Sequence, residues 1–450
     1  MVAGGTARST VRLLRGSATV NAVGVPPDIV AALRRSPGTH SPHEMLSRFD
    51  PSSALTAKCA PRSRRAFMYE EHGATKLRDD EDAAATVRAS PSELAALLHR
   101  TDDEEGRRRH YYWTAPVKAV APHLARDFAW LDRLGRPHER PLADPRGPSL
   151  WMGTSGSATQ CHYDVADNVI AQLHGTKRVR IWPPRAVEAL HVFPDAHPRA
   201  RKSQVDFDRV ACESAGDAGA GDGSHASRYP HFADLPPPSL DVVLRPGDAI
   251  EVPAFWFHHV ENGRVPHANG ANGGSPRECQ DEPSVSVNRF SLGPLMMMAQ
   301  QIFQKASLRP TILMGACVGA NGMDRASSVL GVLGVGLVHG LGVVDDGKEE
   351  EFIRRHLLEA RYVPLLGDAF PRDSRHHDDR EPLTKPEREA AHGCVERIVP
   401  DFLSLLAEGE EEEDRGGIAR LVALHLLELW AVELVGASSV ARAWDRALSQ

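Results

Sequence analysis

Between Ser149 and Phe290 the sequence is a series of short apolar or alternating runs, each bounded by Gly, Pro, Asn or Asp. Runs of this length and rhythm predict β-strands, and many short strands separated by turns favour a sandwich or a barrel. The runs are residues 168–173, 178–184, 241–244, 249–253 and 284–290. We therefore expect a mainly β core with helical additions.

Helical patterns flank this strand-rich core. Residues 90–99 open with a Ser-Pro-Ser-Glu cap signal, and residues 352–366 and 418–434 repeat apolar side chains every three or four positions. The chain is therefore expected to form three regions: 1–145, an α+β section of the same domain as the strand-rich core; 146–293, the strand-rich core; and 294–450, a helical region.

Two stretches of small polar residues interrupt the core, at 213–227 and 262–283. Side chains of this kind bury too little apolar surface to offset the entropy lost on ordering. We expect both stretches to be loop insertions.

The composition of the 450-residue chain, with 25% charged and 41% hydrophobic residues, is ordinary for a soluble globular protein. The net charge of -7 argues against electrostatic attraction between the chain as a whole and nucleic acid. The basic cluster Arg107–Arg109 could still contact a phosphate backbone. The apolar run 328–344 falls short of a bilayer span and contains His339. It predicts a packed helix or a self-association surface, and no membrane partner.

Six cysteines are scattered without the spacing of a metal site, which indicates reduced thiols in an intracellular protein of the cytoplasm or nucleus. Residues 1–27 carry Arg8, Arg12 and Arg15 and no acidic residue, a pattern compatible with an organellar transit peptide. The alternative for this region is a short strand over Val11–Leu14. The residues favour neither.

The first candidate for chemistry is the pair His162 and Asp164, two positions apart at the head of a strand-like segment. Alternation along a strand puts both side chains on one face. With one more histidine from a distant strand they would form a 2-His-1-carboxylate site, which leaves iron positions open for co-substrate and oxygen. An isolated H-x-D pair is common by chance and proves nothing alone.

The third ligand is offered by residues 245–262, where a Pro-Gly-Asp turn leads into a strand that ends at His258 and His259. Neighbouring residues on a strand point to opposite faces, so only one of them can face the pocket. Lys177, past the Gly175 turn, could lie on a strand that returns beside the first and pair with the far carboxylate of a dicarboxylate co-substrate. The hydroxyl of Thr159 could support the same carboxylate.

Two patterns in these segments resemble the JmjC (cupin-like) oxygenase family, in particular its small hydroxylase branch. The pattern T-x-x-H-Y-D…N…Q…G-x-K-R is met at Thr159, His162, Tyr163, Asp164, Asn168, Gln172, Gly175, Lys177 and Arg178. The pattern P-G-D…P-x-x-W-[WF]-H is met at Pro246, Gly247, Asp248, Pro253, Trp256, Phe257 and His258. In the second pattern the first histidine is the ligand, which implies His258 rather than His259.

The resemblance implies a double-stranded β-helix that holds Fe(II) and uses 2-oxoglutarate and O2 as co-substrates. It implies no catalytic residue beyond the metal ligands His162, Asp164 and His258. The 2-oxoglutarate site would be formed by Thr159, Lys177, Tyr112, Asn168 and Asn288. Within residues 110–113 (HYYW), Tyr111 is the alternative to Tyr112.

For the substrate, the resemblance favours a tRNA hydroxylase of the wybutosine type, because the pair Asp167-Asn168 matches that branch. Thr159 and residues 203–208 resemble the asparaginyl hydroxylase that inhibits the hypoxia-inducible factor, so a protein hydroxylase is the alternative. A histone lysine demethylase ranks lower, and a non-enzymatic cupin-fold binding module is the alternative outside catalysis. The C-terminal helices would fit a homodimer or a monomer equally well.

Overall fold

The structure is a computed structural model that describes most of the chain. The described residues are 12–14, 40–61, 66–67, 85–100, 109–133, 142–143, 146–207, 225–263, 282–292, 294–309, 312–313, 322–370, 383–407 and 412–448. The chain forms two compact units. One comprises Thr10–Trp182 and Pro238–Pro294, and the other includes Pro183–Pro237 and Leu295–Gln450.

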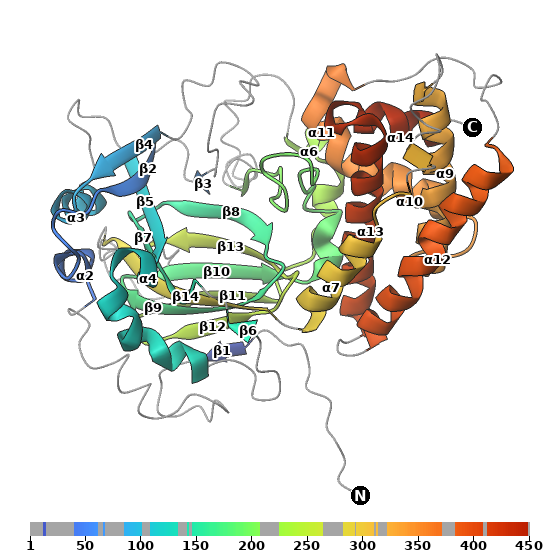
Figure 1. The fold of residues 1–450 in the computed structure, drawn as a ribbon. Helices are drawn as coiled ribbons and strands as arrows, with labels where there is room; N and C mark the ends of the chain where they lie inside the picture. Colours follow the sequence, from blue (N-terminus) through green and yellow to red (C-terminus); the bar gives the residue numbers. More distant parts are fainter. Residues whose placement is uncertain are drawn as a thin grey trace, which may run out of the picture. The chain divides into compact units, whose positions relative to one another are not determined.

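The first unit is built on two β-sheets (Figure 1). The larger sheet has the order β1-β12-β9-β14-β7-β5-β2-β4, with β6 beside β14. Its strands are β1 Arg12–Leu14, β2 Leu55–Pro61, β4 Ala85–Ala89, β5 Arg109–Pro116, β6 Leu142–Ala143, β7 Ser149–Gly153, β9 Asp167–His174, β12 Ala249–Val252 and β14 Ser284–Leu292. The smaller sheet has the order β11-β10-β13-β8-β3. Its strands are β3 Ala66–Phe67, β8 Ala158–Tyr163, β10 Lys177–Trp182, β11 Leu240–Leu244 and β13 Phe257–Asn262.

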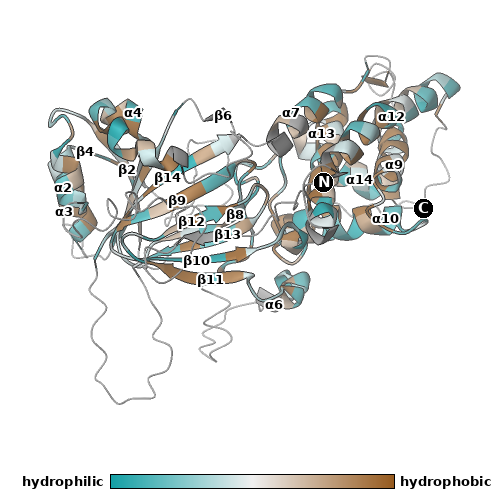
Figure 2. Cartoon of the chain, turned by 90° about the horizontal axis from the view of Figure 1, so that it is seen from below, coloured by the Kyte–Doolittle hydropathy of each residue, from teal (hydrophilic) through white to brown (hydrophobic). Residues whose placement is uncertain are grey.

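The two sheets pack face to face over a shared apolar core. Ile170 and Ile250 of the larger sheet belong to the same buried cluster as Val179, Ile181 and Val260 of the smaller one. Apolar segments along β10 and β11 are brown in Figure 2. The predicted mainly β core is therefore confirmed, and each of the five predicted runs forms a strand.

The outer face of the larger sheet carries a second core. Val169 and Ala171 of β9 and Val285 and Val287 of β14 point to this face, where helical segments cover them. These segments are α2 Pro42–Ser47, α3 Pro91–His99, α4 Val117–Val120 and the 3-10 helix η1 Pro122–Arg133. Successive side chains of a strand point to opposite faces. The residues that alternate with these apolar ones in β9 and β14 therefore face the space between the two sheets.

Helix α3 confirms the helix predicted over residues 90–99. The Ser90 hydroxyl accepts a hydrogen bond from the Glu93 backbone N–H, and the Glu93 carboxylate accepts one from the Ser90 N–H. This capping box satisfies two backbone donors that the first turn would otherwise leave unpaired. Leu94 and Leu98 face the core.

Several expectations fall largely outside the described residues. They are the loop insertion at 213–227, most of the insertion at 262–283 and the transit peptide at 1–27. Within the last range the structure describes β1, which pairs antiparallel with β12 and coincides with the alternative of a short strand. Three cysteines are described, Cys59, Cys161 and Cys394, and all are buried and outside any disulfide.

The second unit is mainly helical. Its elements include α6 His225–Arg228, α7 Pro294–Lys305, α9 Gly322–Gly340, α10 Glu349–Phe352, the π-helix η4 Ile353–Tyr362, α11 Val363–Leu366, α12 Lys385–Ala407, α13 Glu412–Val435 and α14 Val440–Leu448. Its 3-10 helices are η2 Pro184–Val187, η3 Pro230–Asp234, η5 Gly367–Ala369 and η6 Ala437–Ser439. The helices predicted over 352–366 and 418–434 are confirmed by the continuous series α10, η4 and α11 and by α13.

The apolar, glycine-spaced run at 328–344 forms much of α9, which is a packed helix. A side chain at Gly334 would come within 2.7 Å of Trp444, and one at Gly340 within 3.0 Å of Val399. The glycines therefore let α12 and α14 approach α9 closely. No helix in the described part of the chain is long and apolar enough to cross a membrane.

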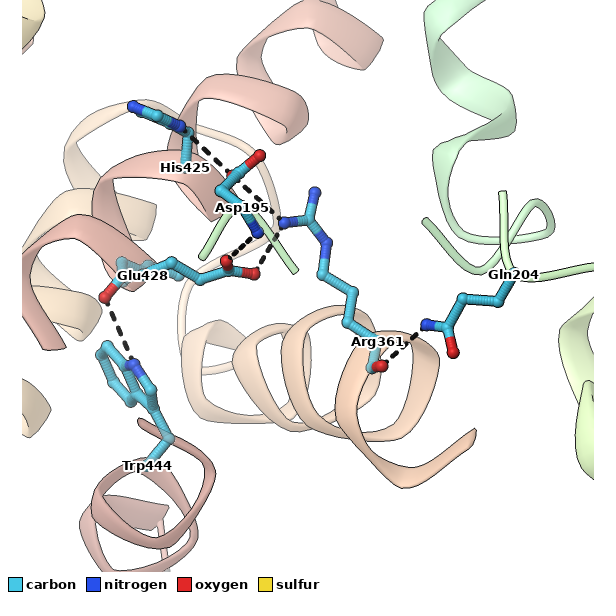
Figure 3. Close-up of polar contacts among 7 residues, drawn as sticks. Asp195, Gln204, Arg361, His425, Glu428 and Trp444 are labelled. Atoms are coloured by element: carbon cyan, nitrogen blue, oxygen red, sulfur yellow. Dashed lines mark hydrogen bonds and ion pairs between the residues drawn. The ribbon is translucent and has the colours of Figure 1, made fainter. Parts of the chain in front are cut away.

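A buried ion cluster joins α13, η4 and the chain that follows η2 (Figure 3). The Arg361 guanidinium donates to Glu428 Oε1 at 2.7 Å and to Asp195 Oδ2 at 3.4 Å. His425 Nδ1 lies 3.2 Å from the same Asp195 oxygen. Because Arg361 and Glu428 are each only 1% exposed, neither charge can regain water if its partner is removed.

Glu428→Ala is expected to destabilise this unit by about 3–5 kcal/mol, since it leaves a buried guanidinium without its closest partner. Asp401→Ala is the matched control, because it breaks an ion pair with Lys305 whose side chains are 53% and 43% exposed. The control should cost less than about 1 kcal/mol. Urea unfolding followed by helical circular dichroism measures both, and equal losses would contradict the role given to the cluster.

Candidate metal centre

Two histidines face each other across the smaller sheet. β8 and β13 pair antiparallel with His162 directly opposite His258, and the two ring centroids are 4.2 Å apart. Directly opposed residues of an antiparallel pair share one face of the sheet. The pairing therefore brings together two imidazoles that are far apart in sequence.

Asp164 completes the group just past the end of β8. The Asp164 backbone carbonyl accepts a hydrogen bond from the Phe255 N–H at 2.7 Å. Its carboxylate oxygens lie 4.0 Å from His162 Nε2 and 3.6 Å from His258 Nε2. The expectation that His162 and Asp164 stand at the head of a strand was wrong, because the strand ends at Tyr163 and the turn held by Phe255 aims the carboxylate.

The orientation of both imidazoles is fixed by backbone carbonyls. His162 Nδ1 lies 2.8 Å from Gln160 O, and His258 Nδ1 lies 3.2 Å from Trp256 O. A ring that donates its Nδ1–H to a carbonyl keeps the Nε2 lone pair for a metal. The ligand atoms of the three residues all lie within 4.8 Å of one another, and the donor set of two imidazoles and one carboxylate suits Fe(II).

His259 points to the opposite face of β13. Its Nε2 lies 3.4 Å from Glu261 Oε1, which also accepts a hydrogen bond from Arg180 at 2.7 Å. Of the two adjacent histidines, His258 thus lies beside His162 and Asp164, and His259 lies beside Glu261 and Arg180 on the other face of the strand.

A β-bulge decides where Thr159 points. Along β13 the register advances two residues, from His258 to Val260, while along β8 it moves three, from His162 to Thr159. The extra residue in β8 reverses its alternation at this point, so that Thr159 shares the interior face with Val260. Without the bulge, residues three apart on a strand would face opposite sides.

Lys177 lies at the start of β10 and faces the space between the sheets. The Gly175 turn, with φ +64°, carries the chain from β9 in the larger sheet to β10 in the smaller one. The expectation that this strand returns directly beside the first was wrong, because β10 lies in the sheet opposite β9 and is separated by β13 from β8, the strand that carries His162. The Lys177 ammonium donates to Ser286 Oγ of β14 at 2.5 Å.

The charge of Lys177 has no partner carboxylate among the described residues. The side chain is only 7% exposed, and burial lowers the pKa of its ammonium to about 7. An ammonium has three donors, and a single hydroxyl satisfies one of them. Such a site favours an incoming anion.

Buried polar side chains continue along the inner face of the larger sheet. Asn288 Nδ2 donates to Asn168 Oδ1 at 3.0 Å, and Trp151 Nε1 donates to Asn288 Oδ1 at 2.6 Å. The Tyr112 ring packs against Trp151, with centroids 5.9 Å apart. Tyr111 belongs instead to the core on the outer face, so Tyr112 is the tyrosine on the same face as this row.

Ser286, Trp151 and the unsatisfied oxygen of Gln172 were missed as site features. Gln172 Oε1 is buried and has no hydrogen-bond partner among the described residues. Ser286 stands two positions before Asn288 on one strand, so alternation alone could have placed it on the same face. Trp151 needed the pairing of β7 with β14, which no local pattern encodes.

A family model described as a cupin-like domain matches residues 28–290. The tRNA wybutosine-synthesizing protein 5 of Danio rerio is 33% identical over 110 residues, 24% of this chain and 27% of that protein. The tRNA wybutosine-synthesizing protein 4 of Gibberella zeae is 33% identical over 147 residues, 32% of this chain and 12% of that protein. The lysine-specific demethylase JMJ31 of Arabidopsis thaliana is 26% identical over 114 residues, 25% of this chain and 18% of that protein. Each alignment covers less than a third of the relative.

His258→Ala is expected to weaken binding of Fe(II), or of Mn(II) as its redox-stable substitute, by at least about tenfold, because it removes one of three ligands. His259→Ala is the matched control one residue away and should bind Mn(II) like the parent chain. Isothermal titration of both variants makes the comparison. Stronger loss with His259→Ala would reassign the ligand.

Proposed function

Because the chain belongs to the cupin-like (JmjC) domain family, we propose that it is an Fe(II)- and 2-oxoglutarate-dependent oxygenase. The observation that carries the proposal is the convergence of His162, Asp164 and His258 at one end of the sandwich strands. Three ligands on one side of an iron leave the remaining positions for co-substrate and oxygen. The side chains of His162 and Asp164 are 19% and 21% exposed, so this side is open to a substrate.

Each ligand has a distinct part in this proposal. His162 and His258 supply neutral Nε2 donors that their carbonyl contacts keep in place, and Asp164 supplies the negative charge. When bound, iron and 2-oxoglutarate together supply the oxidising chemistry that activates O2. The protein contributes position, charge and exclusion of water.

We assign the far carboxylate of 2-oxoglutarate to Lys177 and Thr159. Lys177 is a buried cation with room for two more hydrogen bonds, and binding a carboxylate would supply its missing counter-charge. Thr159 reaches the same interior through the bulge in β8. The Ser286 hydroxyl, which accepts a hydrogen bond from the ammonium, would hold it in place for this carboxylate.

The remaining inner polar residues complete the proposed co-substrate pocket. Asn168 and Asn288 are 3% and 2% exposed and hold each other through their amides. Trp151 fixes the Asn288 amide through a hydrogen bond, and the Tyr112 ring packs against Trp151. These contacts hold the side chains of the proposed pocket in place before a ligand binds.

For the substrate we favour a nucleoside of tRNA, hydroxylated in the manner of wybutosine synthesis. The relatives named for tRNA wybutosine synthesis are 33% identical over their aligned segments, and the relative JMJ31, named as a demethylase, is 26% identical. The demethylase relative JMJ31 supports a protein substrate as the second candidate. In both cases the reaction inserts one oxygen atom from O2 into a C–H bond.

The function is tested with the purified chain, Fe(II), ascorbate and 2-oxoglutarate, with bulk tRNA or a peptide library as substrate. We expect succinate release and a gain of one oxygen atom on a tRNA nucleoside by mass spectrometry. Asp164→Ala should release no succinate. Oxygen gain or demethylation on peptides alone would favour the second candidate, and equal succinate release by Asp164→Ala would contradict an iron oxygenase.

The affinity for 2-oxoglutarate should fall as pH rises above about 7, because the folded-state pKa of Lys177 lies far below the ordinary value and the neutral amine attracts no carboxylate. The limit is about tenfold per pH unit. Titration with Mn(II) in place of iron measures the dissociation constant from pH 6 to 9. Lys177→Ala should bind more weakly at pH 6 and show a flatter profile, while parallel profiles would place the charge elsewhere.

A further inference from the structure

We propose that His339, Asp346 and Glu349 form a second metal site, which takes a divalent transition-metal ion with the preferences of zinc. The site lies in the helical unit, at the turn between α9 and α10. It is separate in the chain from the ligands of the proposed iron centre and does not depend on that activity.

The spacing of the donor atoms fits a tetrahedral ion. His339 Nδ1 lies 3.4 Å from Asp346 Oδ1 and 3.2 Å from Glu349 Oε1. All three ligand atoms lie within 4.8 Å of one another. Zinc bonds to nitrogen and oxygen of about 2.0–2.1 Å at tetrahedral angles separate neighbouring ligands by about 3.3 Å. Both separations from His339 thus match those around one ion, and the Asp346 and Glu349 oxygens lie within 4.8 Å of each other.

A hydrogen bond from the imidazole accounts for this arrangement less well than a bound metal ion does. The single Nδ1 of His339 can donate at most one hydrogen, yet two carboxylate oxygens approach it. Among the described residues, neither Asp346 nor Glu349 forms an ion pair with a lysine or an arginine. The neighbouring Lys348 pairs with Asp345 instead, at 3.1 Å. Two negative charges therefore face one imidazole, and a divalent cation would balance them.

The turn brings the ligands together from both of its sides. α9 ends at Gly340, and positive φ values at Gly342 and Gly347 reverse the chain before α10 begins at Glu349. Glu349 is 7% exposed, which gives the site one anchored ligand. The side chains of His339 and Asp346 are 60% and 92% exposed, so solvent can enter and supply a fourth ligand. A bound ion would tie the end of α9 to the start of α10.

Zinc stoichiometry in the full chain tests the proposal, with Asp164→Ala as the background that disables the iron site. We expect Asp164→Ala to bind one zinc ion, and addition of His339→Gln or Asp346→Asn to weaken that binding by at least about tenfold. Both positions are largely exposed, so the fold should persist, which circular dichroism checks. Isothermal titration and metal analysis after gel filtration give the two readouts, neither of which uses activity.

Asp345→Asn in the same background is the matched control. It removes an exposed acidic charge one residue from Asp346, outside the ligand set. It should keep the zinc affinity within about threefold, because general attraction to an acidic turn is all that it loses. Equal weakening by Asp345→Asn, no zinc bound by Asp164→Ala, or unchanged binding after His339→Gln would each overturn the site.

Discussion

The pairing of β8 with β13 is the interaction on which the proposed chemistry depends. It sets His162 opposite His258, and the bulge within it turns Thr159 to the same interior. The hydrogen bonds of this pairing are those of any antiparallel sheet, so the ligands are positioned by backbone geometry rather than by a flexible loop. Asp164, one residue past the strand, is the only ligand of the three that depends on a turn.

The two faces of the larger sheet bury different kinds of side chain. Its outer face is apolar and buries the N-terminal helices, while its inner face holds Asn168, Gln172, Ser286 and Asn288 between the sheets. Polar groups buried in this way are costly unless they are paired. Their presence beside the apolar cluster that the two sheets share is the physical reason to propose a binding pocket in that part of the interior.

Sequence patterns predicted the local elements and the identity of the candidate ligands. The strands followed from alternation, and the helix at Pro91–His99 followed from its capping box. Strand register, in contrast, is a long-range property, so the bulge beside Thr159, the crossing of Lys177 into the opposite sheet and the contact of Trp151 with Asn288 had no local signal. The same holds for Arg361, whose partners Asp195 and Glu428 are distant in sequence.

The bulge in β8 matters for the proposed activity, whereas the fold does not require it. If β8 kept its length but paired with β13 without the bulge, Gln160 rather than Thr159 would stand opposite Val260, and the strand could still pair fully with β13. The interior would then lose a hydroxyl, although the hydrophobic surfaces that hold the sheets together would be unchanged. A descendant with that regular register would keep the architecture while the proposed co-substrate pocket lost a polar group, a short evolutionary path from an oxygenase to a binding protein.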